Sequence, residues 1–375
     1  MRLRHTHYWL SLLMAAALVP VLRSQHLPLK FDWITLGVAY WFILAAQSIF
    51  VAALLCVIGM PFSQTLRPLL QRYREQPLRV LVLVLFFGLL VWALSGLKAV
   101  ILTVDAIALM ELRERRTSGG LGRAAASVFL PSAYLFFGFL MVLAYNCAVV
   151  SAHFNFAYDP ALATIDRWLL GGHSVSELAH WALSVFPLSF FQGLEFIYFG
   201  MFPQIGAAII LLALGEGRGR AMQFVGTLLV SYYLALVIFY IWTAQGPFYL
   251  CPQHFSRFPA SLQSYKIQKT IIADALALWH HEPISRISTD YFIALPCMHI
   301  VQPLIVMWFL RRWRRIVMLL AAYDLLLLVS ILLLEMHYVV DILAGVLVAA
   351  LAIAISGGPF RNTPAQGADR AEIMG

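Results

Sequence analysis

Charged residues are scarce in this chain: Asp, Glu, Lys and Arg make up 12% of its 375 residues, whereas 62% are hydrophobic. The mean hydropathy is +0.82, far more apolar than a water-soluble domain needs to be. Several apolar runs reach the ~20 residues with which a helix crosses a bilayer. These runs are continuous and do not alternate with polar residues, which excludes a transmembrane β-barrel. We therefore expect an all-α polytopic membrane protein.

Cysteine is also scarce. The four cysteines show neither a CxxC pair nor the spacing of a zinc site, and the adjacent His280, His281 and Glu282 would point in different directions. We therefore expect no metal and no cofactor. Cys251 and Cys297 are both expected on the non-cytoplasmic side, where a disulfide is chemically possible. The sequence leaves open whether it forms.

Basic residues gather in short segments between the apolar runs, and the formal net charge is +8. Such clusters orient membrane helices, because Lys and Arg are enriched in cytoplasmic loops. We therefore interpret them as topology signals and expect no nucleic-acid partner. The clusters are Arg67, Arg72, Arg74 and Arg79; Arg113, Arg115, Arg116 and Arg123; and Arg311, Arg312, Arg314 and Arg315.

The apolar runs divide the chain into three parts. Residues 126–356 are expected to form a six-helix core, residues 1–125 an accessory N-terminal transmembrane region, and residues 357–375 a disordered cytoplasmic tail. The expected spans are 8–23, 33–59, 79–111, 126–150, 187–213, 222–245, 292–310, 316–334 and 337–356.

One run, 79–111, is too long for an ordinary span and short for two. If it crosses once, the basic loop 61–78 and the basic N-terminus both lie outside. If it forms a hairpin near Gly96–Lys98, both return to the cytoplasm. We favour the hairpin, because it satisfies two charge clusters together.

Between the spans, residues 161–170 form an amphipathic stretch that is better suited to lying on the outer membrane surface than to crossing the bilayer. Asp166 and Arg167 within it are either substrate contacts or an exposed pair at the membrane interface, and we favour the exposed pair. Glu195 lies inside a span, where it either pairs with polar residues of the bundle or lines a headgroup cavity.

Three ionisable residues stand at informative places beside the apolar runs. His337 and Asp341 are four residues apart, which on a helix puts both side chains on one face. There the carboxylate can orient the imidazole and stabilise its charge. His299 lies in the span 292–310, near the end that faces the same side of the membrane as His337. We therefore expect these three residues to form one site.

Two histidines, one of them backed by a carboxylate, favour phosphoryl transfer through a covalent phosphohistidine. His337 would be the nucleophile and Asp341 would stabilise its imidazolium, while His299 would protonate the leaving oxygen and later activate the acceptor. Two helix starts at this plane would also favour an anion, because their free N–H groups point at it. Phosphate is the natural ligand, and this arrangement requires no metal.

Two motifs resemble elements of the type-2 phosphatidic acid phosphatase superfamily. Pro296-Cys297-Met298-His299 is similar to its P-S-x-H element, and His337-Tyr338-Val339-Val340-Asp341, followed by Gly345, is similar to its H-Y-x-x-D-x-x-x-G element. The order of elements matches over roughly residues 126–356. Within the superfamily, the chain most resembles the inositol phosphorylceramide synthase branch of the aureobasidin-resistance type.

The chain departs from the phosphatase members of that superfamily at two cationic elements. Residues 243–249 stand where K-x6-R-P is found, and Ile331 follows Ser330 where an arginine is found. Cys297 also replaces a serine. The resemblance implies that substrate contacts, and replacement cations from the outer loop, come from a wider set. That set is Gln245, Pro247, Cys297, Arg257, Lys266, Lys269, Arg286 and Glu335.

Three functions stay open. The resemblance and the missing cations favour a membrane lipid phosphotransferase with its active site on the non-cytoplasmic face. It would move an inositol-phosphate-like headgroup from a phospholipid donor to a ceramide-like lipid or polyol hydroxyl. The alternative enzyme is a lipid or isoprenoid phosphate phosphatase. A non-catalytic lipid-binding or transport protein is the third, and the complete set of His299, His337 and Asp341 argues against it.

Overall fold

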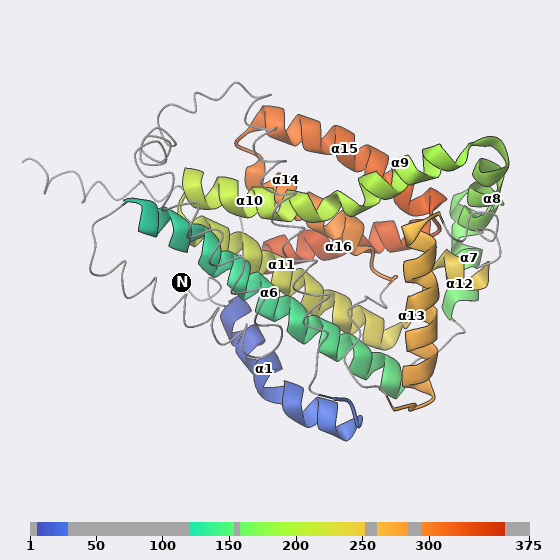
Figure 1. The fold of residues 1–375 in the computed structure, drawn as a ribbon, viewed down its shortest axis with the longest axis horizontal. Coiled ribbons are helices and arrows are strands. Elements are labelled where there is room, and N and C mark those ends of the chain that lie inside the picture. The colour runs from blue at the N-terminus through green and yellow to red at the C-terminus, as the bar shows by residue number, and fades with distance from the viewer. Residues whose placement is uncertain (1–5, 29–119, 154–157, 252–260, 284–293, 357–375) are drawn as a thin grey trace, which may run out of the picture.

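The computed structural model describes residues 6–28, 120–153, 158–251, 261–283 and 294–356 (Figure 1). Every regular element in these residues is a helix, and six helical segments among them are long and apolar enough to cross a membrane. The chain is thus an all-α polytopic membrane protein. The expected spans 33–59 and 79–111 lie outside the described residues, and so does the question of a hairpin in the second.

The described spans agree with the sequence-based prediction, apart from their ends. They are α1 (Thr6–Ser24), α6 (Gly120–His153), α9 (Leu188–Phe199) continued by α10 (Met201–Gly215), α11 (Arg218–Ile241), α15 (Arg314–Leu333) and α16 (Val339–Ser356). The expected span 292–310 contains a shorter apolar helix, α14 (Met298–Leu310). It begins six residues later than expected, because Pro296 has no N–H and disfavours helix before it. The four residues ahead of α14 form part of the site described below.

Helix α11 lies at the centre of the bundle, where it packs on α6, α10, α14 and α16. Its fully buried residues include Phe224 and Leu228, and α14 contributes Val301 and Ile305 to the same core. Helices α14 and α16 approach closely at Gly345, where a Cβ would lie 2.7 Å from the carbonyl oxygen of Cys297. Glycine at this position therefore lets α16 cross the start of α14.

Four shorter helices gather at one end of the bundle (Figure 1). They are α7 (Tyr158–Leu169), α8 (Val175–Val185), α12 (Pro247–Leu250) and α13 (Gln263–Trp279), and α13 runs across the axes of the long helices. Helix α8 begins with a capping box in which Ser174 and Glu177 satisfy each other's backbone N–H groups. The amphipathic stretch 161–170 forms most of α7. These helices cover the end at which α11 finishes and α14 and α16 begin.

Candidate active site

Three non-helical segments meet beneath the short helices: the turn after α11, the residues before α14, and the residues between α15 and α16. Backbone hydrogen bonds join them. Ala294 N–H donates to Ala244 O at 3.2 Å, and Phe248 N–H donates to Glu335 O at 3.2 Å. Cys297 N–H donates to Asp341 O at 3.0 Å. Irregular backbone is tolerated in a membrane bundle only where its polar groups are satisfied, so these bonds fix the frame of the site.

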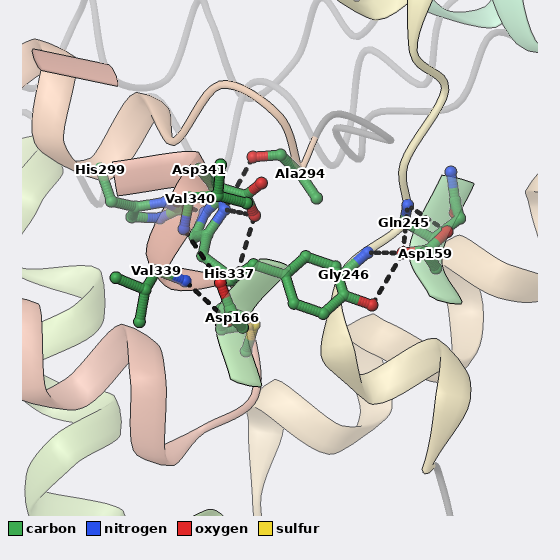
Figure 2. A network of polar contacts seen from close by, with 12 residues as sticks. Asp159, Asp166, Gln245, Gly246, Ala294, His299, His337, Val339, Val340 and Asp341 are labelled. Atoms are coloured by element: carbon green, nitrogen blue, oxygen red, sulfur yellow. Dashed lines mark hydrogen bonds and ion pairs between the residues drawn. The ribbon is translucent and has the colours of Figure 1, made fainter. Parts of the chain in front are cut away.

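The two histidines face each other within this frame (Figure 2). His299 Nδ1 lies 3.1 Å from His337 Nε2. His337 Nδ1 lies 2.8 Å from the carbonyl oxygen of Ala294 and 3.4 Å from Asp341 Oδ2. Because a carbonyl and a carboxylate only accept, His337 Nδ1 carries the hydrogen. In the neutral ring, Nε2 carries the lone pair and faces His299.

Asp341 is fully buried and supports this arrangement in two ways. Its Oδ2 atom accepts a hydrogen bond from Tyr338 N–H at 2.8 Å as well as facing His337. The sequence placed His337 and Asp341 on one face of a helix, but α16 begins only at Val339. The two side chains meet across the turn that starts the helix, because the carboxylate reaches back to cap it. The expected trio is therefore brought together by a different local geometry.

A cavity of ≈ 220 Å³ opens beside the histidine pair. Aromatic and aliphatic side chains from α6, α9, α10, α13 and α14 form most of its wall. Its polar lining residues, apart from the histidines, are the amides Gln245, Gln268 and Gln302 and the phenols Tyr198 and Tyr232. Among the described residues that line it, none is Lys or Arg. A ligand in this cavity would therefore meet two imidazoles and neutral hydrogen-bonding groups.

The remaining expected contact residues are spread more widely. Gln245 lines the cavity, and Cys297 is fully buried next to the histidines. Pro247 is buried at the start of α12, and Glu335 is fully buried with a positive φ of 53°. Neither of these two lines the cavity. Cys251 and Cys297 are free thiols, so the structure has no disulfide between them.

Of the four expected cations, the structure describes two. Lys266 and Lys269 are exposed on α13, whereas the neighbouring Ile267 and Gln268 of the same helix line the cavity. The Lys269 ammonium lies 5.3 Å from the centroid of the Tyr265 ring. Arg257 and Arg286 lie outside the described residues.

Two aspartates of α7 belong to the site, although the sequence did not predict them there. Asp166 was interpreted as one of an exposed pair, and this was wrong: it is fully buried and accepts hydrogen bonds from Val339 N–H at 2.9 Å and Val340 N–H at 3.1 Å. Arg167 is exposed as expected. The amphipathic pattern of α7 shows a buried face, but nothing in it says that a carboxylate on that face meets the start of α16.

Asp159 is the second of these aspartates (Figure 2). It accepts hydrogen bonds from Gln245 N–H at 3.1 Å, from Gly246 N–H at 2.8 Å and from the Tyr338 hydroxyl at 3.2 Å. Burial raises the pKa of Asp159 to about 6, and the nearby Asp341 carboxylate adds to the rise, while these three hydrogen bonds oppose it. Asp159 therefore ties α7 to both loops of the site.

The start of α16 is capped from within the protein. The N–H groups of Tyr338, Val339 and Val340 donate to Asp341 and Asp166. The sequence predicted that this helix start would attract a phosphate. Because these three donors already bind carboxylates, they are not available to a ligand anion.

Glu195 lies inside a span, as the sequence indicated. Its carboxylate accepts a hydrogen bond from Ser264 N–H at the start of α13, so it joins this span to a shorter helix at the end of the bundle.

Comparisons with known proteins identify the family to which the chain belongs. No curated protein and no solved structure matches the chain. The family profile of the PAP2 superfamily, however, matches residues 160–355, which is more than half of the chain and includes His299, His337 and Asp341. This chain, an integral membrane protein with a buried pair of histidines backed by a carboxylate, therefore belongs to the PAP2 superfamily.

Proposed function

We propose that this protein is a lipid phosphotransferase that moves a phosphorylated headgroup from a phospholipid to a hydroxyl acceptor through a covalent intermediate on His337. One observation carries the proposal: the Nε2 lone pair of His337 faces a second histidine at the wall of a largely apolar cavity. Family membership supports a phosphatase or phosphotransferase that acts on lipids. The finer assignment rests on the arguments below.

In the first half-reaction, His337 Nε2 attacks the phosphorus of the donor. A nitrogen–phosphorus bond forms while the bond from phosphorus to the diacylglycerol oxygen breaks. His299 donates a proton to that leaving oxygen. The hydrogen on His337 Nδ1 stays shared with the Ala294 carbonyl and Asp341, which stabilise the positive charge that develops on the ring.

In the second half-reaction, the acceptor hydroxyl attacks the same phosphorus. His299, now neutral, takes the hydroxyl proton, and the nitrogen–phosphorus bond breaks to restore His337. Each proton that leaves His299 in the first step is thus regained in the second. The two half-reactions share one site because a single imidazole acts first as the acid and then as the base.

The distance between the histidines bears on how a donor enters. Attack requires the nitrogen and the phosphorus to approach to about 3–3.5 Å, with the leaving oxygen beyond the phosphorus. The two imidazole nitrogens are only 3.1 Å apart, so a phosphoryl group does not fit between them. Donor binding therefore requires the His299 ring to move away from His337. The cavity beside His299 provides room for that movement.

Charge favours a phosphodiester donor over a phosphomonoester. A monoester carries about −1.5 to −2 charges at pH 7, whereas a diester carries one. Burying more anionic charge without cations is costly. Since the described lining residues contain no Lys or Arg, a singly charged diester suits this cavity better. This supports headgroup transfer of the kind that the inositol phosphorylceramide synthase branch performs, with a phosphatidylinositol-like donor and a lipid or polyol hydroxyl as acceptor.

The test is a lipid panel assayed with the purified protein. Diester phospholipids and phosphomonoester lipids would be supplied with and without ceramide-like and polyol acceptors, and products would be identified by mass spectrometry. We expect transfer products from a diester donor, with little release of free phosphate. Hydrolysis of monoesters to free phosphate, with no transfer, would instead identify a lipid phosphatase.

A further inference from the structure

The cluster around the two histidines has a third potential metal ligand, the thiol of Cys297. The ligand atoms of Cys297, His299 and His337 all lie within 4.8 Å of one another. Cys297 is fully buried. This residue stands where the related motif has a serine, and a hydroxyl would be a poor ligand for the same ions.

The donor set and its spacing suit a borderline-soft divalent ion. One thiolate and two imidazoles are ligands that Zn²⁺ prefers, with metal–nitrogen bonds of about 2.0–2.1 Å and a metal–sulfur bond of about 2.3 Å. Two such nitrogens in a tetrahedron lie about 3.3 Å apart. His299 Nδ1 and His337 Nε2 are 3.1 Å apart, so the pair needs little movement to hold one ion.

The surroundings hold each ligand in place. His337 donates its other ring N–H to the Ala294 carbonyl, which is the partner that metal-binding histidines usually have. The His299 ring stacks on Tyr198 with a centroid distance of 4.3 Å. The backbone of Cys297 is fixed by its N–H bond to Asp341 O. The two imidazoles and the Cys297 backbone are therefore held in place, and a shift of the Cys297 side chain brings its sulfur to the ion.

We propose that Cys297, His299 and His337 form an inhibitory Zn²⁺ site. On binding, the Cys297 thiol loses its proton to solvent and its sulfur joins the two imidazole nitrogens around the ion. Water or a phosphate oxygen from the cavity takes the fourth position. The Nε2 lone pair of His337 cannot bind the ion and attack phosphorus together, so metal binding and turnover exclude each other. Only the inhibition, not the binding, rests on the function proposed above.

Binding is tested on the full-length protein in detergent, with Co²⁺ as a spectroscopic stand-in for Zn²⁺. We expect one Co²⁺ per chain, a thiolate-to-cobalt charge-transfer band, and displacement by Zn²⁺. Cys297→Ser should abolish the band and weaken Zn²⁺ binding by at least roughly 10-fold, since even loss of an outer partner costs about 10–100-fold. Cys251→Ser, which changes a free thiol outside the group of Cys297, His299 and His337, should keep the band.

A measurement without any variant guards against misfolding of Cys297→Ser. X-ray absorption of the Zn²⁺-loaded native protein should show one sulfur at about 2.3 Å and nitrogen ligands at about 2.0–2.1 Å. A shell without sulfur, or a charge-transfer band that survives Cys297→Ser, would overturn the site.

Inhibition is tested by titrating Zn²⁺ into the transfer assay. We expect transfer to fall with the occupancy measured by Co²⁺ displacement, and a chelator to restore it. In Cys297→Ser, the Zn²⁺ concentration for half inhibition should rise at least roughly 10-fold relative to that variant's own metal-free rate. Full occupancy with unchanged turnover would overturn the inhibitory role. A protein that binds the ion as described but shows no transfer would retain the site and refute the proposed function.

Discussion

At the residue scale, the nucleophilic role that we propose for His337 depends on what binds its other nitrogen. The Ala294 carbonyl and the Asp341 carboxylate both face Nδ1, so the hydrogen stays on Nδ1 and the lone pair stays on Nε2. Asp341 is the charged member of this pair of acceptors. It should therefore contribute mainly when the ring becomes positive.

Replacing Asp341 by Asn tests this role. The amide keeps the shape of the side chain but removes the charge that stabilises the imidazolium, so kcat should fall by about 10²-fold or more. The lipid-transfer assay measures the fall, and thermal unfolding shows whether the fold survives. Asp274→Asn, the same change on α13 outside the cavity lining, should retain activity. Equal activity of the two variants would refute the role given to Asp341.

The sequence predicted that His299, His337 and Asp341 come together, because ionisable residues are rare beside apolar spans and their spacing carries information. It did not predict Asp159 and Asp166. Each lies on an amphipathic helix where an acidic residue is usually exposed, and only the packing of α7 against the turn after α11 and the start of α16 shows that both are buried. The exposed positions of Lys266 and Lys269 were equally beyond the sequence, since they depend on the rotation of α13 about its axis.

At the element scale, α7 acts as a clamp on the start of α16. Asp166→Ala removes the acceptor for two backbone N–H groups at that helix start. Loss of such a cap costs about 1–2 kcal/mol, and here the freed donors are half-buried. We expect a lower unfolding temperature in detergent and a reduced kcat, because His337 lies directly before α16. Thr164→Ala, on the exposed face of α7, provides the control and should change neither.

The buried Asp159 predicts a dependence of stability on pH. Its pKa is about 6 in the folded protein and close to 4 when unfolded, so the folded state binds more protons between these values. Its contribution is therefore complete below about pH 4 and is lost as the pH rises through 6. For Asp159→Asn, unfolding temperatures measured from pH 4 to pH 7 should fall less steeply than for the native protein. Identical slopes would show that Asp159 does not titrate as described.

The sequence predicted the presence of the spans more reliably than their ends. Hydropathy placed α11, α15 and α16 within a few residues, because long apolar runs leave little freedom. The predicted starts of α14 and α16 were too early because of local chemistry. Pro296 prevents α14 from beginning sooner, and the Asp341 side chain caps the Tyr338 N–H just before α16 begins. These deviations are what bring the two histidines together.

At the scale of the whole molecule, the site and the basic cluster lie at opposite ends of the same helices. Helix α14 runs from His299 to Arg311, and α15 returns from Arg314 towards the residues that precede His337. Arginines between spans favour the cytoplasm. This supports our proposal that the site opens on the non-cytoplasmic face.

Orientation can be tested by adding one cysteine at a time to a Cys251→Ser background, which keeps the other three native cysteines. Ser261→Cys, an exposed position at the covered end, should react with a membrane-impermeant thiol reagent in sealed cells. Arg312→Cys, exposed at the other end, should react only after permeabilisation. The background protein provides the baseline for both. The reverse labelling pattern would place the site on the cytoplasmic face.

The central claim is that His337 carries the headgroup between donor and acceptor, and a trapping experiment tests it most directly. The protein would be incubated with phospholipid radiolabelled at phosphorus, without acceptor, then quenched and digested. We predict acid-labile, alkali-stable label on the peptide that contains His337, its loss when an acceptor is added, and no label on His337→Asn. Transfer by His337→Asn, or transfer by the native protein with no labelled histidine, would contradict the account.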